Sequence, residues 1–266
     1  MWNILKTTLF APRDTTAYPP CGMFTPAHLT VLALVLVLVA VGVHVCKNVS
    51  REKLKKITKI VAVAATLAEV AKITYNLAYG YTWLDAWVPL AFCSLFIYAT
   101  LAAGFGKGII EKLGAGFLLG GSPTAGLLFL LFPTTSLQMH PIYHFLCIHS
   151  MLFHGAMLWL GLAYILGGHF AVNGKTFGFY AAFCSAFALP ALILNLTLGC
   201  NMMFLREPFN IPLRFVSLLY EFSHGLYTVL IFCAYLACYL ASLGVSKLAE
   251  YVRRRQRTNE TEGEKI

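Results

Sequence analysis

Residues 25–46 read TPAHLTVLALVLVLVAVGVHVC and contain no Asp, Glu, Lys or Arg. A membrane hydrocarbon core about 30 Å thick needs roughly 20 apolar helical residues to cross it, and this stretch has that length. Between Thr25 and Ser242 the pattern returns, with apolar stretches that each end in a short polar loop. These stretches are apolar on all sides, whereas a helix on the surface of a soluble protein is apolar along one face. The chain is therefore predicted to be an all-α, polytopic membrane helix bundle.

The composition supports this class and argues against a soluble protein. Of the 266 residues, 59% are hydrophobic and 12% are charged, and the mean hydropathy is +0.72. Soluble domains carry about 25% charged residues. The net charge of +9 does not indicate nucleic acid, because most basic residues lie in a few loops and the tail. There they set membrane topology and meet anionic headgroups.

Seven transmembrane spans are predicted in one domain, residues 25–242. They are Thr25–Cys46, Ile60–Gly80, Ala86–Gly104, Ala115–Phe132, Pro141–Leu166, Gly178–Leu198 and Arg214–Ser242. A non-cytosolic segment, residues 1–24, precedes this domain. A basic and then acidic tail, residues 243–266, follows it and is predicted to be partly disordered.

The distribution of positive charge predicts the orientation. One side of the predicted bundle collects Lys47, Arg51, Lys53, Lys55, Lys56, Lys59, Lys107, Lys112, Lys175, Lys247, Arg253, Arg254, Arg255, Arg257 and Lys265. The other side holds Lys6, Arg13, Arg206 and Arg214. Because cytosolic loops are enriched in Lys and Arg, we expect a cytosolic C-terminus and an N-terminus that is outside or lumenal.

The second predicted span carries three polar residues on one helical face. Glu69, Lys72 and Asn76 are three and four residues apart, so their side chains are neighbours on a helix. One interpretation is an ion pair with an amide neighbour that holds the bundle together. The other is a polar wall of a substrate cavity. Ionisable residues inside a membrane are rare and often functional.

Cys93 and His154 are the candidate catalytic residues. Cys93 lies roughly 10 Å inside the third span, four residues after Pro89, which bends a helix and frees backbone carbonyls. A buried cysteine usually only packs; it becomes a nucleophile when a histidine or a helix N-terminus stabilises the thiolate. His154 lies deep in the fifth span beside Gly155, where a neutral imidazole could serve such a thiol.

The fifth span contains further histidines, which raise the question of a metal site. His140 and His154 lie about 21 Å apart along a helix and cannot share an ion. His140 and His144 could, but they lie near the membrane surface. No metal is expected. After the sixth span, Asn201 lies either in an ordinary loop or in a partly inserted loop that lines a cavity.

An ordered set of short motifs now stands out. It comprises Phe24-Thr25…His28-Leu29, an acidic residue in the second span, Pro89-Leu90-Ala91-Phe92-Cys93, a Gly-rich fourth span ending at Pro133, Phe153-His154-Gly155, and Leu198-Gly199-Cys200-Asn201-Met202-Met203-Phe204-Leu205 before Pro208. In this order the chain resembles the YwaF-type integral membrane family, which includes the eukaryotic transmembrane protein 164. The resemblance covers roughly residues 20–240.

The resemblance implies a membrane acyltransferase that moves a fatty acyl chain from a phospholipid to a lysophospholipid through a cysteine and a histidine. By position these are Cys93 and His154, although His149 matches the depth of Cys93 better on straight helices. The substrate-pocket candidates are His28, Glu69, Asn76, His149 and Asn201. No cofactor or nucleic-acid partner is expected. The host membrane is the plasma membrane for a bacterial protein, or the endoplasmic reticulum or another endomembrane for a eukaryotic one.

Other functions stay open at this point. A small-solute transporter would use a polar cavity around Glu69, Lys72 and Asn76 and would tolerate loss of Cys93. A haem-bearing redox protein would use histidine pairs across helices, and a scaffold or receptor would need no chemistry. The sequence leaves the oligomeric state undetermined.

Overall fold

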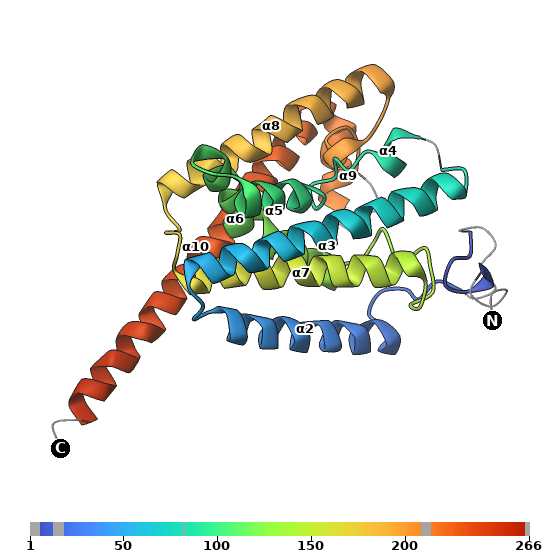
Figure 1. Cartoon of the computed structure of the whole chain (residues 1–266). Coiled ribbons are helices and arrows are strands. Elements are labelled where there is room, and N and C mark those ends of the chain that lie inside the picture. The colour runs from blue at the N-terminus through green and yellow to red at the C-terminus, as the bar shows by residue number, and fades with distance from the viewer. Residues whose placement is uncertain (1–5, 13–18, 82, 209–213, 264–266) are drawn as a thin grey trace.

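A computed structural model of the chain describes residues 6–12, 19–81, 83–208 and 214–263. Within these ranges the secondary structure is helical and contains no strand. Its elements are α2 (Pro26–Cys46), α3 (Arg51–Ala78), α4 (Leu84–Trp87), α5 (Leu95–Phe105), α6 (Ile109–Leu131), α7 (Phe145–Gly167), α8 (Gly174–Leu198), the 3₁₀ helix η2 (Met202–Phe204), α9 (Arg214–Phe222) and α10 (His224–Gly263) (Figure 1).

Five of the described helices are long and apolar enough to cross a membrane: α2, α6, α7, α8 and the His224–Val252 part of α10. The predicted class is therefore confirmed, and the chain is an integral, multi-pass membrane protein. α3 lies alongside α7 in the same bundle (Figure 1) but carries charged residues, and α5 is short. Seven crossings, and the orientation, stay predictions.

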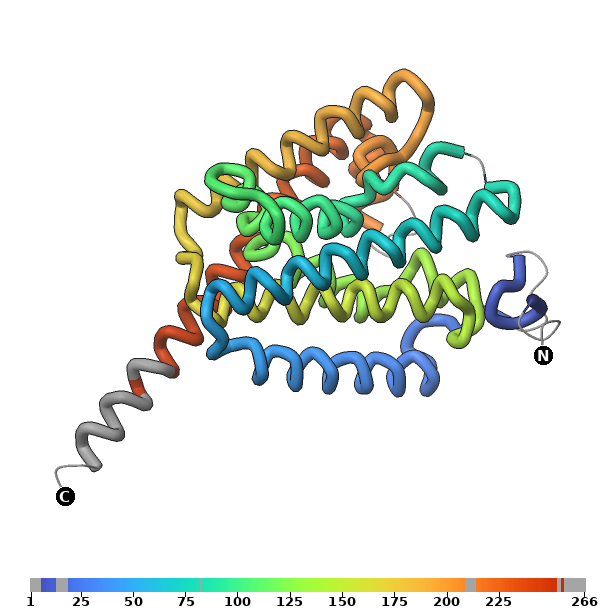
Figure 2. Tube along the Cα trace, in the orientation of Figure 1, coloured from blue at the N-terminus to red at the C-terminus, as the bar shows by residue number. Residues whose placement is uncertain are grey.

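Two predicted spans differ from the observed helices. The prediction of one helix over Ala86–Gly104 is wrong, because the chain is non-helical at 88–94 between α4 and α5 (Figure 2). Proline at position 89 explains the break, since it lacks an N–H and clashes with a preceding helical turn. The prediction of one helix over Arg214–Ser242 is also wrong. The helix is interrupted at Ser223, which separates α9 from α10. α10 then continues through the predicted tail to Gly263.

Local sequence signals explain where several helices begin and end. Thr25 caps α2 by accepting a hydrogen bond from the His28 N–H, and Pro26 follows in the first turn. Asn173 and Thr176 form a capping box at the start of α8. α7 and α8 end at Gly168 and Gly199, whose φ values of 68° and 71° are left-handed and favour glycine.

α6 is the central helix of the bundle. Of its most apolar stretch 67% is buried within the protein, against 22% for α2 and 11% for α10. Small residues allow its neighbours to approach closely. A Cβ at Gly114 would lie 2.6 Å from the Ala103 nitrogen of α5, and one at Gly126 would lie 2.7 Å from the His154 carbonyl oxygen of α7.

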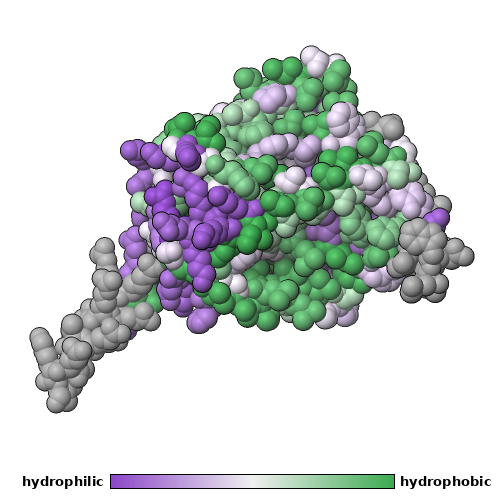
Figure 3. All heavy atoms as spheres, viewed as in Figure 1, coloured by the Kyte–Doolittle hydropathy of each residue, from purple (hydrophilic) through white to green (hydrophobic). Residues whose placement is uncertain are grey.

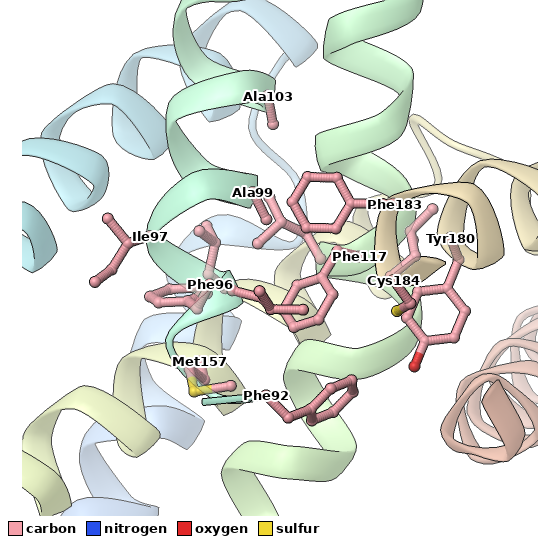
Figure 4. Packing of buried hydrophobic residues seen from close by; sticks show 14 of the residues in the cluster. Phe92, Phe96, Ile97, Ala99, Ala103, Phe117, Met157, Tyr180, Phe183 and Cys184 are labelled. Atoms are coloured by element: carbon pink, nitrogen blue, oxygen red, sulfur yellow. The ribbon is translucent and has the colours of Figure 1, made fainter. Parts of the chain in front are cut away.

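The main apolar core surrounds α6. Phe117 of α6 packs near Phe96 of α5 and Phe183 of α8 (Figure 4), and its ring centroid lies 5.5 Å from that of Phe183. At one of these interfaces the Ser122 hydroxyl of α6 donates to the Met157 carbonyl of α7 at 2.8 Å. Such pairing stabilises the bundle because a membrane interior provides no water for unsatisfied groups.

One end of the bundle is strongly polar. The α2–α3, α5–α6 and α7–α8 connections lie together at this end (Figure 1), and hydrophilic atoms gather there while the flank is largely hydrophobic (Figure 3). Glu111 organises it by pairing with Arg51 at 2.9 Å and with Lys55 at 2.7 Å. The basic loops predicted to share one side therefore do lie at the same end.

Candidate functional site

Cys93 lies in the non-helical stretch immediately before α5. The carbonyl oxygens of Cys93 and Ser94 accept the N–H groups of Phe96 and Ile97 at 3.0 and 3.1 Å, which begins the first turn. A thiol before a helix experiences the positive end of the helix dipole and backbone donors, and both favour a thiolate. Because the helix is broken near Pro89, Cys93 lies just before a helix N-terminus, whereas in a continuous helix it would lie in the middle of the span.

The aromatic residue before Cys93 holds this stretch inside the bundle. Phe92 is buried, and its ring stacks on Tyr235 of α10 with centroids 4.0 Å apart and planes at 5°. Phe92 and Met157 of α7 belong to the same cluster of buried hydrophobic residues (Figure 4). Cys93 itself is half-buried. The stretch that holds the thiol thus packs against α10 through Phe92 and leads into α5, which packs against α3 and α6.

His154 of α7 presents one ring nitrogen without a partner. Its Nδ1 donates to the Ser150 carbonyl at 2.7 Å, and its ring stacks on Phe129 of α6 at 3.6 Å. The side chain is buried, and among the described residues its Nε2 has no hydrogen-bond partner. Because Nδ1 carries the proton in this arrangement, Nε2 holds a lone pair that can accept one.

His149 is the second histidine with such a nitrogen. Its Nε2 has no hydrogen-bond partner in the part of the chain that the structure describes. Its ring stacks on Phe153 at 5.7 Å, and Phe153 meets Phe96 of α5 edge-on at 5.5 Å. No hydrogen bond between Cys93 and either imidazole occurs within the described ranges.

Glu69 and Lys72 form an ion pair of 2.6 Å within α3. The Glu69 side chain is 6% exposed and that of Lys72 is 28% exposed. α3 packs against α5, which follows Cys93, and against α7, which carries His149 and His154. We call the region that holds Cys93, His149 and His154 the Cys93 site.

The remaining pocket candidates make structural hydrogen bonds. The His28 Nδ1 accepts the Phe24 N–H at 2.9 Å, and its Nε2 donates to the Leu130 carbonyl at 3.0 Å. The Asn76 amide donates to the Ala86 carbonyl at 2.6 Å, which fixes α4 against α3.

Asn201 organises its own loop, residues 199–208. Its side-chain oxygen accepts the N–H groups of Arg206 and Glu207, and its backbone N–H donates to Asp85 at 3.1 Å. Asn195 holds the same loop by bonding both the N–H and the carbonyl of Met202, at 2.7 and 2.9 Å. Met202, Met203 and Leu205 are buried. The loop therefore packs into the protein, and its amides shape it. Insertion into the membrane and lining of a cavity stay predictions.

Tyr235 was not identified from the sequence. Its hydroxyl donates to the Met203 carbonyl, and its ring covers Phe92 beside the thiol. Tyr227 and Tyr239 lie eight residues before and four after it, a spacing that keeps all three near one face of α10. This tyrosine stripe in an apolar helix was the available signal.

The histidines at the start of α7 are engaged locally. The rings of His140 and His144 stack at 4.1 Å. The His144 Nε2 bonds with the Ala11 carbonyl at 2.9 Å and lies 3.2 Å from the Tyr75 hydroxyl. Across the described residues, no group of three or more His, Cys, Asp or Glu could hold a metal ion.

Comparison with known proteins assigns the chain to a family of membrane proteins. The model of the TMEM164 family matches residues 23–245, which is most of the chain and includes α2 to α9 and much of α10. The chain belongs to the TMEM164 family. No curated protein sequence and no solved structure matches it.

Proposed function

We propose that the protein is a phospholipid acyltransferase that transfers a fatty acyl chain from a phospholipid to a lysophospholipid through Cys93. The observation that carries this proposal is the buried His154 Nε2, which has no hydrogen-bond partner among the described residues. Leaving a buried polar atom unpaired costs about 1–3 kcal/mol, so each such atom calls for an explanation, and a catalytic role is one. A lone pair in this state is suited to accept a proton from a thiol.

The first half of the reaction acylates the enzyme. His154 accepts the Cys93 proton at Nε2, and the thiolate attacks the carbonyl carbon of the donor ester. A sulfur–carbon bond forms and the ester carbon–oxygen bond breaks. The imidazolium returns its proton to the departing oxygen, so a lysophospholipid leaves and Cys93 carries the acyl chain as a thioester.

The second half transfers the acyl chain. The hydroxyl of the accepting lysophospholipid gives its proton to the neutral His154 while its oxygen attacks the thioester carbon. The carbon–sulfur bond breaks, and the thiolate recovers the proton from the imidazolium. The exchange of one ester for another balances without a coenzyme, metal or nucleotide.

Backbone N–H groups at the start of α5 are suitable donors to the carbonyl oxygen during attack. The first N–H groups of a helix have no acceptor within it, and Cys93 directly precedes Ser94, the N-cap of α5. Donors fixed where negative charge develops contribute strongly to catalysis. These groups are better placed than Asn76 and Asn201, whose amides hold α4 and the 199–208 loop.

A lipid substrate suits the surroundings. The flank of the bundle is largely hydrophobic (Figure 3), and Cys93 is half-buried among apolar helices. Each buried CH₂ of an acyl chain contributes about 0.8 kcal/mol, so both lipids can reach the site while their chains stay in the apolar phase. A small-solute transporter is less well supported, because Glu69, Lys72 and Asn76 are engaged with one another or with Ala86.

The test uses the purified full chain in detergent with an acyl-labelled phosphatidylcholine and a panel of lysophospholipids. We expect transfer by the wild type, none by Cys93→Ala, and a labelled thioester on Cys93 after rapid acid quenching. His154→Gln and His149→Gln separate the two candidate bases, and we expect the former to lower the rate by roughly 10²–10⁴-fold.

Cys184→Ala, which removes a buried thiol of α8, is the matched control and should keep its activity. Full activity of Cys93→Ala, or no transfer by the wild type with any acceptor, would overturn the proposal. Solute flux in vesicles that survives Cys93→Ala would then favour the transporter.

A further inference from the structure

Two cysteines lie at the end of the bundle opposite the Arg51–Glu111 pair. Cys21 comes shortly before α2, and Cys147 lies in the first turn of α7. Because the α2–α3 and α7–α8 connections share the polar end (Figure 1), both helices begin at the other end, which is the predicted non-cytosolic one. The Cys21 side chain is half-buried, that of Cys147 is buried, and both thiols are free in this structure.

A single backbone carbonyl contacts both cysteines. The His140 oxygen accepts the Cys21 N–H at 3.0 Å, and the Cys147 thiol donates to the same oxygen at 3.7 Å. The next residue fixes the chain a second time, because the Gly22 N–H donates to the Leu137 carbonyl at 2.8 Å. The Cys21 side chain also packs against the buried apolar cluster that includes Cys147. These contacts bring together two cysteines that are far apart in the sequence.

The environment of the pair is one in which cysteines are oxidised. Burial alone explains a single cysteine, which behaves as a small hydrophobic residue, but it does not explain a second one on the same carbonyl. Disulfides form and persist in the lumen of the endoplasmic reticulum, in the periplasm and outside cells. The predicted orientation places Cys21 and Cys147 near that side of the membrane, whereas Cys46 ends α2 at the polar end.

We propose that Cys21 and Cys147 form a disulfide that ties the chain before α2 to the start of α7. The oxidant is a small-molecule or protein disulfide on the non-cytosolic side. The half-buried Cys21 attacks it first as a thiolate, so a mixed disulfide forms and one thiol leaves with the proton. The Cys147 thiolate then attacks the Cys21 sulfur, and the second thiol leaves with the second proton. The two cysteines are oxidised, and the oxidant is reduced to two thiols.

The local contacts permit this bond to form. The Cys21 sulfur must leave the Thr25 hydroxyl, which lies 3.4 Å away, and the Cys147 sulfur must turn from the His140 carbonyl. Sulfur is a weak donor and a weak acceptor, so little is lost when both side chains rotate. The Cys21 N–H keeps the His140 carbonyl satisfied after the Cys147 thiol has turned away.

The disulfide would strengthen the attachment of α2 to the bundle. α2 packs chiefly against α7, and 22% of its most apolar stretch is buried within the protein. A cross-link stabilises the folded state mainly by restricting the unfolded chain, and more so when the closed loop is long. The loop between Cys21 and Cys147 spans almost half of the chain. We therefore expect reduction to lower the unfolding temperature by roughly 5–10 °C.

The experiment maps the disulfide in the full chain. Cells are lysed in detergent with excess iodoacetamide, which alkylates free thiols, and the purified protein is cleaved with cyanogen bromide without reductant. Cleavage after Met23, Met139 and Met151 releases residues 2–23 and 140–151, and each of these peptides contains one cysteine. We expect the two peptides to be joined and to separate when reductant is added. Two separate alkylated peptides, or residues 2–23 joined to a different fragment, would overturn the inference.

Cys21→Ser and Cys200→Ser form a matched pair of variants, because Cys200 follows α8 and also lies near the predicted non-cytosolic end. Reductant should lower the unfolding temperature of the wild type and of Cys200→Ser. It should have no effect on Cys21→Ser, in which we expect Cys147 to be recovered alkylated. An effect of reductant that persists in Cys21→Ser would contradict the inference. Neither readout requires acyl transfer, so the outcome is independent of the proposed function.

Discussion

His28 and His154 are both buried histidines of the bundle, and their ring nitrogens are used differently. His28 uses both, toward Phe24 and Leu130, while His154 uses Nδ1 toward Ser150 and has no partner for Nε2 within the described ranges. A histidine with both nitrogens satisfied has no lone pair available for proton transfer. At the scale of the residue, this difference separates a structural group from a candidate base.

His28→Ala is therefore expected to affect stability rather than chemistry. The change leaves the Phe24 N–H and the Leu130 carbonyl unpaired, at a cost of about 1–3 kcal/mol for each buried group. We expect a lower unfolding temperature in detergent but normal acyl transfer per folded molecule. His44→Ala, which removes an exposed histidine from the same helix, should leave the unfolding temperature unchanged. Loss of activity with normal stability would contradict this prediction and indicate that His28 contributes to the substrate pocket.

At the scale of the element, two breaks in helices shape the Cys93 site. Residues 88–94 leave helical geometry and deliver the thiol to the start of α5. The loop 199–208 enters the bundle, where Met203 and Phe204 take positive φ values of 55° and 50°. Backbone carbonyls of this loop are satisfied by α10, because the hydroxyls of Tyr227, Thr228 and Tyr235 donate hydrogen bonds to them. Irregular backbone at membrane depth is tolerated where protein surrounds it.

The close contact of α6 with α7 is expected to control both stability and activity. In Gly126→Val the new side chain would meet the His154 carbonyl and the Leu158 nitrogen, at 2.7 and 2.8 Å from Cβ. The helices must separate, because backbone atoms cannot yield as a flexible side chain can. We expect a strongly lowered unfolding temperature and loss of acyl transfer.

Gly178→Val is the matched control for this prediction. Gly178 is also a glycine in a long apolar helix, but nothing lies within 4 Å of its added Cβ. We expect it to unfold near the wild-type temperature and to stay active. Equal effects of the two substitutions would show that helix propensity, rather than the α6–α7 contact, governs the loss.

At the scale of the whole molecule, charge is segregated along the bundle. The polar surface in Figure 3 lies at the end that contains Arg51, Lys55 and Glu111. In Figure 1, α3, α6 and α8 each begin at this end and finish at the other. This arrangement agrees with an orientation set by the enrichment of Lys and Arg in cytosolic loops.

Labelling with a membrane-impermeant maleimide tests that orientation. In intact cells or sealed vesicles of known sidedness, Lys56→Cys and Lys175→Cys should be labelled only from the cytosolic face, and Glu207→Cys only from the opposite face. All three residues are exposed in the structure, and peptide mapping distinguishes the new cysteines from the native ones. Labelling of all three from one face would contradict the predicted topology.

The sequence by itself determined the membrane class, the approximate position of most helices and the segregation of basic loops. These properties follow from local length, hydropathy and charge, because transfer into a bilayer depends mainly on each segment. It also singled out Cys93, His154, Glu69 and Lys72 as unusual in an apolar chain, while their roles stay proposals.

Only the tertiary structure decided which polar atoms have partners. The bonds of His28 to Leu130, Asn76 to Ala86 and Tyr235 to Met203 join segments that are far apart in the sequence or separated by a turn. The break before α5, which places Cys93 ahead of a helix, also replaces a span that hydropathy predicted as continuous. Hydropathy records how strongly a segment prefers the membrane, whereas the pairing of its few polar groups depends on which helices become neighbours.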